Sequence, residues 1–187
     1  GTLRDLSAHC ATLGWDELSP AGLKRLAALD PCKLPEVRGK PRLGVPFTGI
    51  SKIVGVGLNY RDHARETGAA IPTEPVLFMK ATTAINGPND DIVLPRGSTS
   101  TDWEAELGLV IGTTARYVSE AEALSHLAGY VTFHDVSERD FQKNRGGTWD
   151  KGKGCDSFAP IGPWLVTRDE VADPQRLRVW CEVNGRM

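Results

Sequence analysis

Two glutamates separated by a single residue, inside an otherwise apolar stretch, limit most strongly how this chain can fold. The stretch runs from Trp103 to Gly112 and reads Trp-Glu-Ala-Glu-Leu-Gly-Leu-Val-Ile-Gly. In an extended strand alternate side chains share a face, so Glu104 and Glu106 are expected to point the same way. The apolar side chains of the other face would then pack into the core: Ala105, Leu107, Leu109 and Ile111.

Two carboxylates this close would suit a cation site. They repel each other and raise each other's pKa, a cost that a divalent cation would remove. A third acid, Asp135, ends the stretch Val131-Thr-Phe-His. All-oxygen ligation suits a hard ion such as Mg²⁺, with Mn²⁺ or Ca²⁺ as substitutes. The alternative for Glu104 and Glu106 is a strand whose acidic face is simply solvated.

Composition excludes several classes of protein. The 187 residues are 40% hydrophobic and 25% charged, with a net charge of −2, which is ordinary for a globular protein. No basic run favours nucleic acid, and no apolar stretch approaches the about 20 residues of a membrane span. The four cysteines are scattered, without Cys-x-x-Cys spacing, which fits reduced thiols. We therefore expect a cytoplasmic protein without a nucleic-acid or membrane partner.

Proline and glycine signals divide the chain. A helix is expected over residues 20–29 after Ser19, and the prolines that follow mark an extended linker. The sequence thus predicts a small N-terminal domain over residues 1–48 and a larger domain over residues 49–187 that carries the acids. Asn184-Gly185 is a strong hairpin-turn signal without a returning strand, so we expect the C-terminal part of the larger domain to be missing.

From residue 50 onward, strand-forming stretches outnumber helical ones. They do not alternate with helices as a doubly wound fold requires, so the predicted class is β-rich α+β. Helices are expected over residues 60–67 and 119–127, and strands near residues 51–57, 75–80, 91–94, 103–112, 129–135, 160–167 and 177–184.

A histidine and a glutamate on the first of these helices form a candidate catalytic pair. His63 and Glu66 are three residues apart and share a helical face, so the carboxylate could orient the imidazole as a general base. The alternative is an exposed polar helix face with both side chains solvated.

Two further segments carry side chains that suit a substrate. Arg139 and Gln142 follow Asp135 at helical spacing, and the arginine could hold a substrate carboxylate or form only a surface ion pair. Lys153 lies in the glycine-rich loop 146–156, where it could stabilise an oxyanion or simply be a lysine of a surface loop.

In their order and spacing these motifs resemble the fumarylacetoacetate hydrolase family over roughly residues 50–187. The resemblance implies a mixed β-roll with a small N-terminal cap domain, a deep Mg²⁺ site, and a homodimer or higher homo-oligomer. The segments that carry it are Val56-Gly-Leu-Asn-Tyr-Arg-Asp-His63-Ala-Arg-Glu66, Pro75-Val-Leu-Phe-Met-Lys80 with Asn86-Gly-Pro88, Asp102-Trp-Glu104-Ala-Glu106-Leu, Asp135-Val-Ser-Glu-Arg139-Asp-Phe-Gln142 and Lys151-Gly-Lys153-Gly-Cys-Asp156.

Carried over position by position, the resemblance assigns roles in the catalytic domain. His63 with Glu66 matches the catalytic dyad, and Lys153 matches the catalytic loop lysine. His134 departs from the asparagine expected before the third acid. The implied metal ligands are Glu104, Glu106 and Asp135, and the implied substrate-binding residues are Arg139 and Gln142.

The resemblance also implies a reaction: metal-dependent hydrolysis of the C3–C4 bond of a 2,4-dioxo acid. His63 would take a proton from water, and Lys153 would stabilise the oxyanion formed at the 4-carbonyl. The products would be pyruvate and a second acid such as lactate, because the motifs look most like enzymes for 2,4-diketo-3-deoxy acids of L-rhamnonate or L-fuconate. Alternatives are an oxaloacetate-type decarboxylase, a ureidoglycolate lyase and a non-catalytic metal-binding scaffold.

Overall fold

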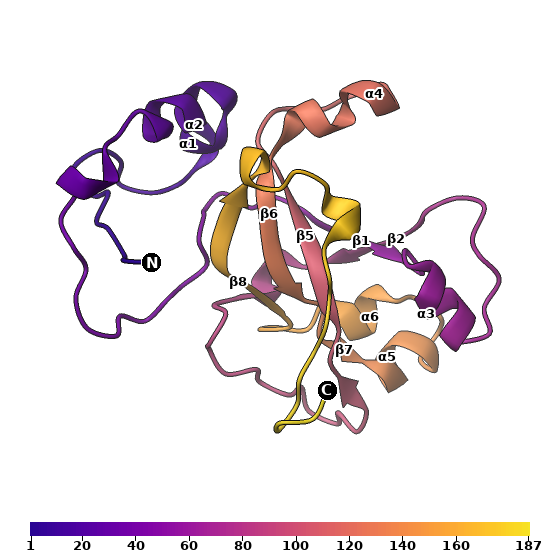
Figure 1. Cartoon of the computed structure of the whole chain (residues 1–187). Coiled ribbons are helices and arrows are strands. Elements are labelled where there is room, and N and C mark those ends of the chain that lie inside the picture. The colour runs from indigo at the N-terminus through magenta and orange to yellow at the C-terminus, as the bar shows by residue number, and fades with distance from the viewer.

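A four-stranded sheet forms the centre of the structure, a computed structural model that describes all 187 residues (Figure 1). In spatial order its strands are β3 (Ile85–Asn86), β8 (Ala159–Thr167), β6 (Leu127–His134) and β5 (Ala105–Ile111). Strand β6 pairs antiparallel with both β5 and β8, whereas β3 runs parallel to β8. Because β5 and β6 lie side by side, the acids at their ends come together.

Two smaller sheets flank the central one. Strands β1 (Ile53–Gly57) and β2 (Val76–Lys80) form an antiparallel ribbon. Strands β4 (Thr101–Asp102) and β7 (Ser137–Glu138) form a short antiparallel pair. Both carry side chains of the candidate site, so the site depends on how these small sheets sit against the central one.

Short helices connect the strands. The α-helices are α1 (Trp15–Leu18), α2 (Pro20–Ala27), α3 (Arg61–Glu66), α4 (Glu120–Ala123), α5 (Arg139–Lys143) and α6 (Asp150–Lys153). The 3₁₀ turns are η1 (Pro31–Lys33), η2 (Thr82–Ala84), η3 (Leu124–His126), η4 (Arg168–Glu170) and η5 (Pro174–Arg176). No helix has the length and apolar character that a membrane crossing requires. The predicted β-rich α+β class is confirmed.

The hydrophobic core lies in two clusters. The first joins the N-terminal helices to the central sheet, because Leu18 packs with side chains of β5, β6 and β8. The second lies behind Asp135 and holds the strand end that carries this acid. The first cluster consists of Leu18, Val110, Ala128, Val131 and Ile161, and the second of Ala84, Val136, Phe158 and Ala159.

The buried face of β5 is opposite to the predicted one. Val110 is 7% exposed, whereas Leu109 and Ile111 are 53% and 48% exposed. Glu106 is four residues before Val110 and shares its face. The expectation that the Leu109 and Ile111 face packs into the core is therefore wrong. The acidic face is the inner one because the core cluster and the charged partners of the acids lie on that side.

Two of the predicted strands do not form. In the segment near 91–94, the Val93 N–H donates to the Ser157 hydroxyl at 2.8 Å instead of joining a ladder. In the segment near 177–184, Leu177 and Trp180 are exposed, and the only pairing is the bridge from Val183 to Arg186. Both segments have strand-forming composition but no partner strand beside them.

Local signals were predicted more accurately. The Ser19 hydroxyl accepts from the N–H of Gly22 at 3.1 Å and caps α2, which has a proline at its start. Asn184 and Gly185 have φ angles of 52° and 76°, as the predicted two-residue hairpin turn requires. The helix predicted over 119–127 forms as α4 followed by η3.

Gly152 lets α6 lie directly on the segment that carries Arg139. A Cβ at position 152 would lie 2.3 Å from the Glu138 carbonyl oxygen and 2.7 Å from the backbone nitrogen of Gln142. Since both neighbours are backbone atoms, the helices would have to move apart.

We expect Gly152→Ala to lower the free energy of unfolding by about 1–3 kcal/mol, because the added methyl group overpacks this contact. Chemical denaturation would measure the loss. Gly44→Ala is the matched control, since the nearest atom to a Cβ there is a side-chain nitrogen of Arg42 at 3.6 Å. An equal effect of both substitutions would contradict the packing argument.

Candidate active site

Three acids meet where β5 begins and β6 ends. Glu104 directly precedes β5, Glu106 lies in it, and Asp135 directly follows β6. The Asp135 N–H donates to the Glu104 carbonyl oxygen at 3.0 Å, which extends the pairing of the two strands. The predicted neighbourhood of the three acids is thus present.

Lys153 bridges two of these acids. Its ammonium lies 2.7 Å from Glu104 Oε2 and 2.8 Å from Asp135 Oδ2, and the residue is 2% exposed. The ammonium also lies 4.9 Å from the centroid of the Phe78 ring, in cation–π range. The lysine predicted from the glycine-rich loop therefore belongs to the acid cluster.

The position of the Phe78 ring depends on a glycine in the neighbouring strand. Gly55 is paired with Phe78 across the ribbon, and a Cβ on this glycine would lie 2.1 Å from the Cζ atom of the ring. The absence of a side chain at Gly55 therefore leaves room for the ring in its position close to Lys153.

Lys80 is a second buried lysine of the site, and sequence reasoning gave it no role. Its ammonium lies 2.6 Å from Asp135 Oδ1 and 3.0 Å from the carbonyl oxygen of Val136. Burial lowers the pKa of Lys80 although Asp135 opposes this. Burial alone would raise the pKa of Asp135, but Lys80 and Lys153 hold it below its ordinary value. Alternation in β2 could have revealed this lysine, since it shares the inner face with Phe78.

Glu106 is the acid that forms no ion pair. Burial raises its pKa to about 7, and the charges of Glu104 and Asp135 add to this effect. Its polar neighbour is the hydroxyl of Tyr60, the residue before α3. Burial and the Glu106 charge raise the pKa of Tyr60 in turn. Tyr60 was also missed, because nothing local in the sequence indicates that it reaches β5.

The Arg139 guanidinium contacts two carboxylates and one amide of this protein. Its Nη1 lies 2.6 Å from Glu104 Oε1 and 3.1 Å from Gln142 Oε1. Its Nε and Nη2 each lie 2.9 Å from Asp102 Oδ2. Arg139 and Gln142 share a helix face as expected, and their binding of substrate stays a prediction.

His63 and Glu66 form a pair at the surface. His63 Nδ1 lies 3.7 Å from Glu66 Oε2, and the side chains are 53% and 80% exposed. No contact joins this pair directly to the three acids. Tyr60, at the start of the same helix, provides the connection between α3 and Glu106.

The carboxylate oxygens of the cluster are the type of donor that a hard divalent cation prefers. Three carboxylates are neighbours, and Glu106 forms no ion pair, although the charge of Lys153 partly offsets the rise in its pKa that burial causes. However, no three acid, histidine or cysteine side chains are gathered in a ligand arrangement. The residues that could hold a cation are Glu104, Glu106 and Asp135. Joint ligation would require the Lys153 ammonium to leave its place between two of them.

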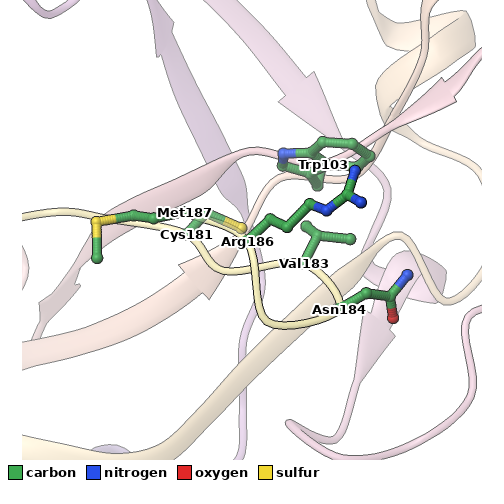
Figure 2. Close-up of a pocket in the computed structure, with 6 residues that line it drawn as sticks. All are labelled: Trp103, Cys181, Val183, Asn184, Arg186 and Met187. Carbon is green, nitrogen blue, oxygen red and sulfur yellow. The ribbon is translucent and has the colours of Figure 1, made fainter.

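Two surface cavities lie apart from the acids. The larger one, of about 590 Å³, is formed by the last residues of the chain around Trp103, with the Arg186 side chain beside the indole (Figure 2). Its lining residues are Trp103, Cys181, Val183, Asn184, Arg186 and Met187. A smaller cavity of about 270 Å³ lies along the start of α3 and the loop before β2. Neither cavity includes an acid of the cluster.

Comparison with known proteins identifies the family. A family model described as the fumarylacetoacetate (FAA) hydrolase C-terminal region matches residues 52–187. This chain belongs to the fumarylacetoacetate hydrolase family. A protein named "Putative hydrolase" from Burkholderia ambifaria is 60% identical over 185 residues, which are 99% of this chain and 66% of that protein. The chain thus spans slightly less than two thirds of the length of this relative.

Solved structures support the family's fold. A fumarylacetoacetate hydrolase from the psychrophilic Exiguobacterium antarcticum has a TM-score of 0.72 at 31% identity, over 91% of this chain and 61% of that one. A 5-carboxymethyl-2-hydroxymuconate delta-isomerase from Mycobacterium smegmatis has a TM-score of 0.58 at 40% identity, over 72% of this chain and 48% of that one. The family resemblance and the fold class predicted from the sequence are both confirmed.

The raised pKa of Glu106 predicts a pH-dependent effect of removing its charge. The folded state keeps this proton up to about pH 7, while an unfolded chain loses it near the ordinary value of 4.5, so stability falls as pH rises between the two. Without divalent cations, we expect Glu106→Gln to raise the free energy of unfolding at pH 8 by on the order of 2–3 kcal/mol. At pH 4 the gain should vanish. Equal gains at both pH values, measured by urea unfolding, would contradict the assigned pKa.

Proposed function

We propose that this chain carries the catalytic centre of a metal-dependent hydrolase that cleaves the C3–C4 bond of a 2,4-dioxo acid. The observation that supports this most directly is Glu106, a half-buried carboxylate whose pKa is raised by burial and by the charges of Glu104 and Asp135 close by, and which forms no ion pair. A bound Mg²⁺ would neutralise the carboxylates of Glu104, Glu106 and Asp135, and Mn²⁺ or Ca²⁺ would be substitutes. When bound, it would supply Lewis-acid polarisation of the substrate's 2-oxo group.

His63 is proposed as the general base. Glu66 lies close enough to orient its imidazole, and the exposure of the pair gives it access to water. His63 takes a proton from water, and the resulting hydroxide attacks the 4-carbonyl carbon. Cleavage of the C3–C4 bond leaves its electron pair on C3, which is then protonated to give pyruvate, and the other fragment leaves as an acid.

Lys153 is proposed to stabilise the oxyanion. An ammonium has three N–H donors, and Glu104 and Asp135 accept from two of those of Lys153. A cation held jointly by the acids would displace the ammonium from between them, so its N–H donors would become available to an oxygen that develops negative charge, and burial strengthens that interaction. Arg139 and Gln142 lie at the same cluster and are proposed to orient the substrate once it is bound.

The proposed substrate class is a small 2-oxo acid, with 2,4-diketo-3-deoxy sugar acids of L-rhamnonate or L-fuconate as the first choice. The second product from the rhamnonate substrate would be lactate. A homodimer or higher homo-oligomer is proposed as the working form. Oxaloacetate decarboxylation and ureidoglycolate cleavage are alternatives because they would use the same acid cluster.

A second candidate is isomerisation of an unsaturated oxo acid. It is favoured by the 40% identity to the delta-isomerase from Mycobacterium smegmatis. Such a reaction moves a proton between carbons and needs no attack by water. The two candidates therefore differ in whether carbon–carbon cleavage products appear.

The first experiment is to measure pyruvate release from 2,4-diketo-3-deoxy-L-rhamnonate by the purified protein, with Mg²⁺ and then with EDTA. Pyruvate and lactate in equal amounts, lost with EDTA, would support the hydrolase. Pyruvate from oxaloacetate alone would favour the decarboxylase, and a shifted double bond without cleavage would favour the isomerase. No turnover with any of these substrates, although Mg²⁺ binds, would support the metal-binding scaffold.

Two substitutions should separate cation binding from water activation. Glu106→Ala is expected to abolish both Mg²⁺ binding and turnover, because it removes a proposed ligand. His63→Ala should leave Mg²⁺ affinity unchanged and lower kcat for hydrolysis by about 10²–10⁴-fold, the usual contribution of a general base. Calorimetry and a coupled pyruvate assay would measure the two effects. A near-normal rate of hydrolysis in His63→Ala would contradict the proposed role of this residue as general base.

A further inference from the structure

A fully buried carboxylate without any cationic partner lies beside the acid cluster. Glu138 is 0% exposed, and it immediately precedes Arg139, which holds Glu104. A buried charge is costly unless hydrogen bonds or opposite charges compensate it. Glu138 forms no ion pair, so its compensation must come from neutral donors.

The turn of residues 98–101 supplies most of these donors. Both carboxylate oxygens of Glu138 accept from the Ser100 N–H at 3.1 Å. Glu138 Oε2 also accepts from the hydroxyls of Ser98 and Thr101, the latter at 3.0 Å. On the other side, Oε1 accepts from the N–H of Asp140 at the start of α5, at 3.1 Å. One carboxylate thus joins the turn to α5.

This connection positions the residues on either side of the Arg139 guanidinium, which are Asp102 and Glu104. The turn leads into β4, whose Asp102 accepts from Arg139 Nε at 2.9 Å. The Arg139 N–H donates to the Ser100 carbonyl oxygen, also at 2.9 Å. On its other side the guanidinium meets Glu104 at 2.6 Å. The orientation of Glu104 therefore depends on the turn that Glu138 holds.

We propose that Glu138 is a positioning residue of the acid cluster, which fixes the 98–101 turn so that Asp102 holds the Arg139 guanidinium against Glu104. Glu138 itself touches neither the other acids nor a substrate. The consequence for Mg²⁺ affinity rests on the proposed function, whereas the orientation of Arg139 does not.

The first test follows the Arg139 Nε–H by ¹H–¹⁵N NMR, with the signal assigned by its absence from Arg139→Lys. The wild-type protein is expected to show a slowly exchanging signal, because Asp102 accepts this hydrogen. Glu138→Gln places an amide NH₂ against the donors of the turn, so the signal should be lost or broadened. Asp102→Ala removes the acceptor and should have the same effect, and the chain is expected to stay folded because the Asp102 side chain is 41% exposed.

The second test measures Mg²⁺ affinity by calorimetry. Glu138→Gln and Asp102→Ala are each expected to weaken binding by about 10–100-fold, as loss of a residue that orients a metal ligand does. The double variant should bind Mg²⁺ as tightly as the single variant with the lower affinity, because both substitutions act through Arg139. Additive losses would mean that the two residues act independently and would overturn the proposal.

Two controls separate positioning from general loss of stability. Leu18→Ala removes a side chain of the first core cluster and should lower Tm without changing the Arg139 signal or Mg²⁺ affinity. Glu122→Gln removes a carboxylate that caps α4 and should change neither the Arg139 signal nor the Mg²⁺ affinity. An unchanged Arg139 signal in Glu138→Gln, or an equal loss of signal in Leu18→Ala, would overturn the proposal. A wild-type protein that shows the signal but binds no Mg²⁺ would contradict the proposed function and leave the positioning role supported.

Discussion

The arrangement of the site depends on Asp135 and the two lysines that share its carboxylate. Lys80 comes from β2, Asp135 follows β6, and Lys153 ends α6, so one acid cross-links three separate elements. Removing one member of such a buried group leaves an uncompensated charge at a cost of several kcal/mol. The ribbon, the central sheet and α6 can therefore occupy their observed positions only together.

From Asp135 the charges alternate in sign across the site. Lys153 pairs with Asp135 and with Glu104, and Arg139 pairs with Glu104 and with Asp102. Each of these acids has a cation at hydrogen-bond distance. Glu106 is the exception, and its burial among acids is a local conflict of the kind that functional sites retain. This contrast separates the three acids that are bound in ion pairs from the one acid that is not.

Sequence reasoning succeeded where the determining interactions are local. The Ser19 cap and the Asn184-Gly185 turn depend on residues a few positions apart, and both form as predicted. It also gathered the three acids, because they lie at the ends of adjacent strands. It failed for the buried face of β5 and gave no role to Lys80 or Glu138, since a partner distant in sequence decides each of these.

The missing side chain at Gly55 has a consequence for how this family can change over time. The Phe78 ring occupies the space that a larger residue would need, and the Lys153 ammonium lies 4.9 Å from the centroid of that ring. A methyl group gained at Gly55 would displace the ring and so change its contact with the lysine ammonium. These three positions therefore constrain one another across two strands and a helix, and we expect relatives that keep the same chemistry to conserve all three residues.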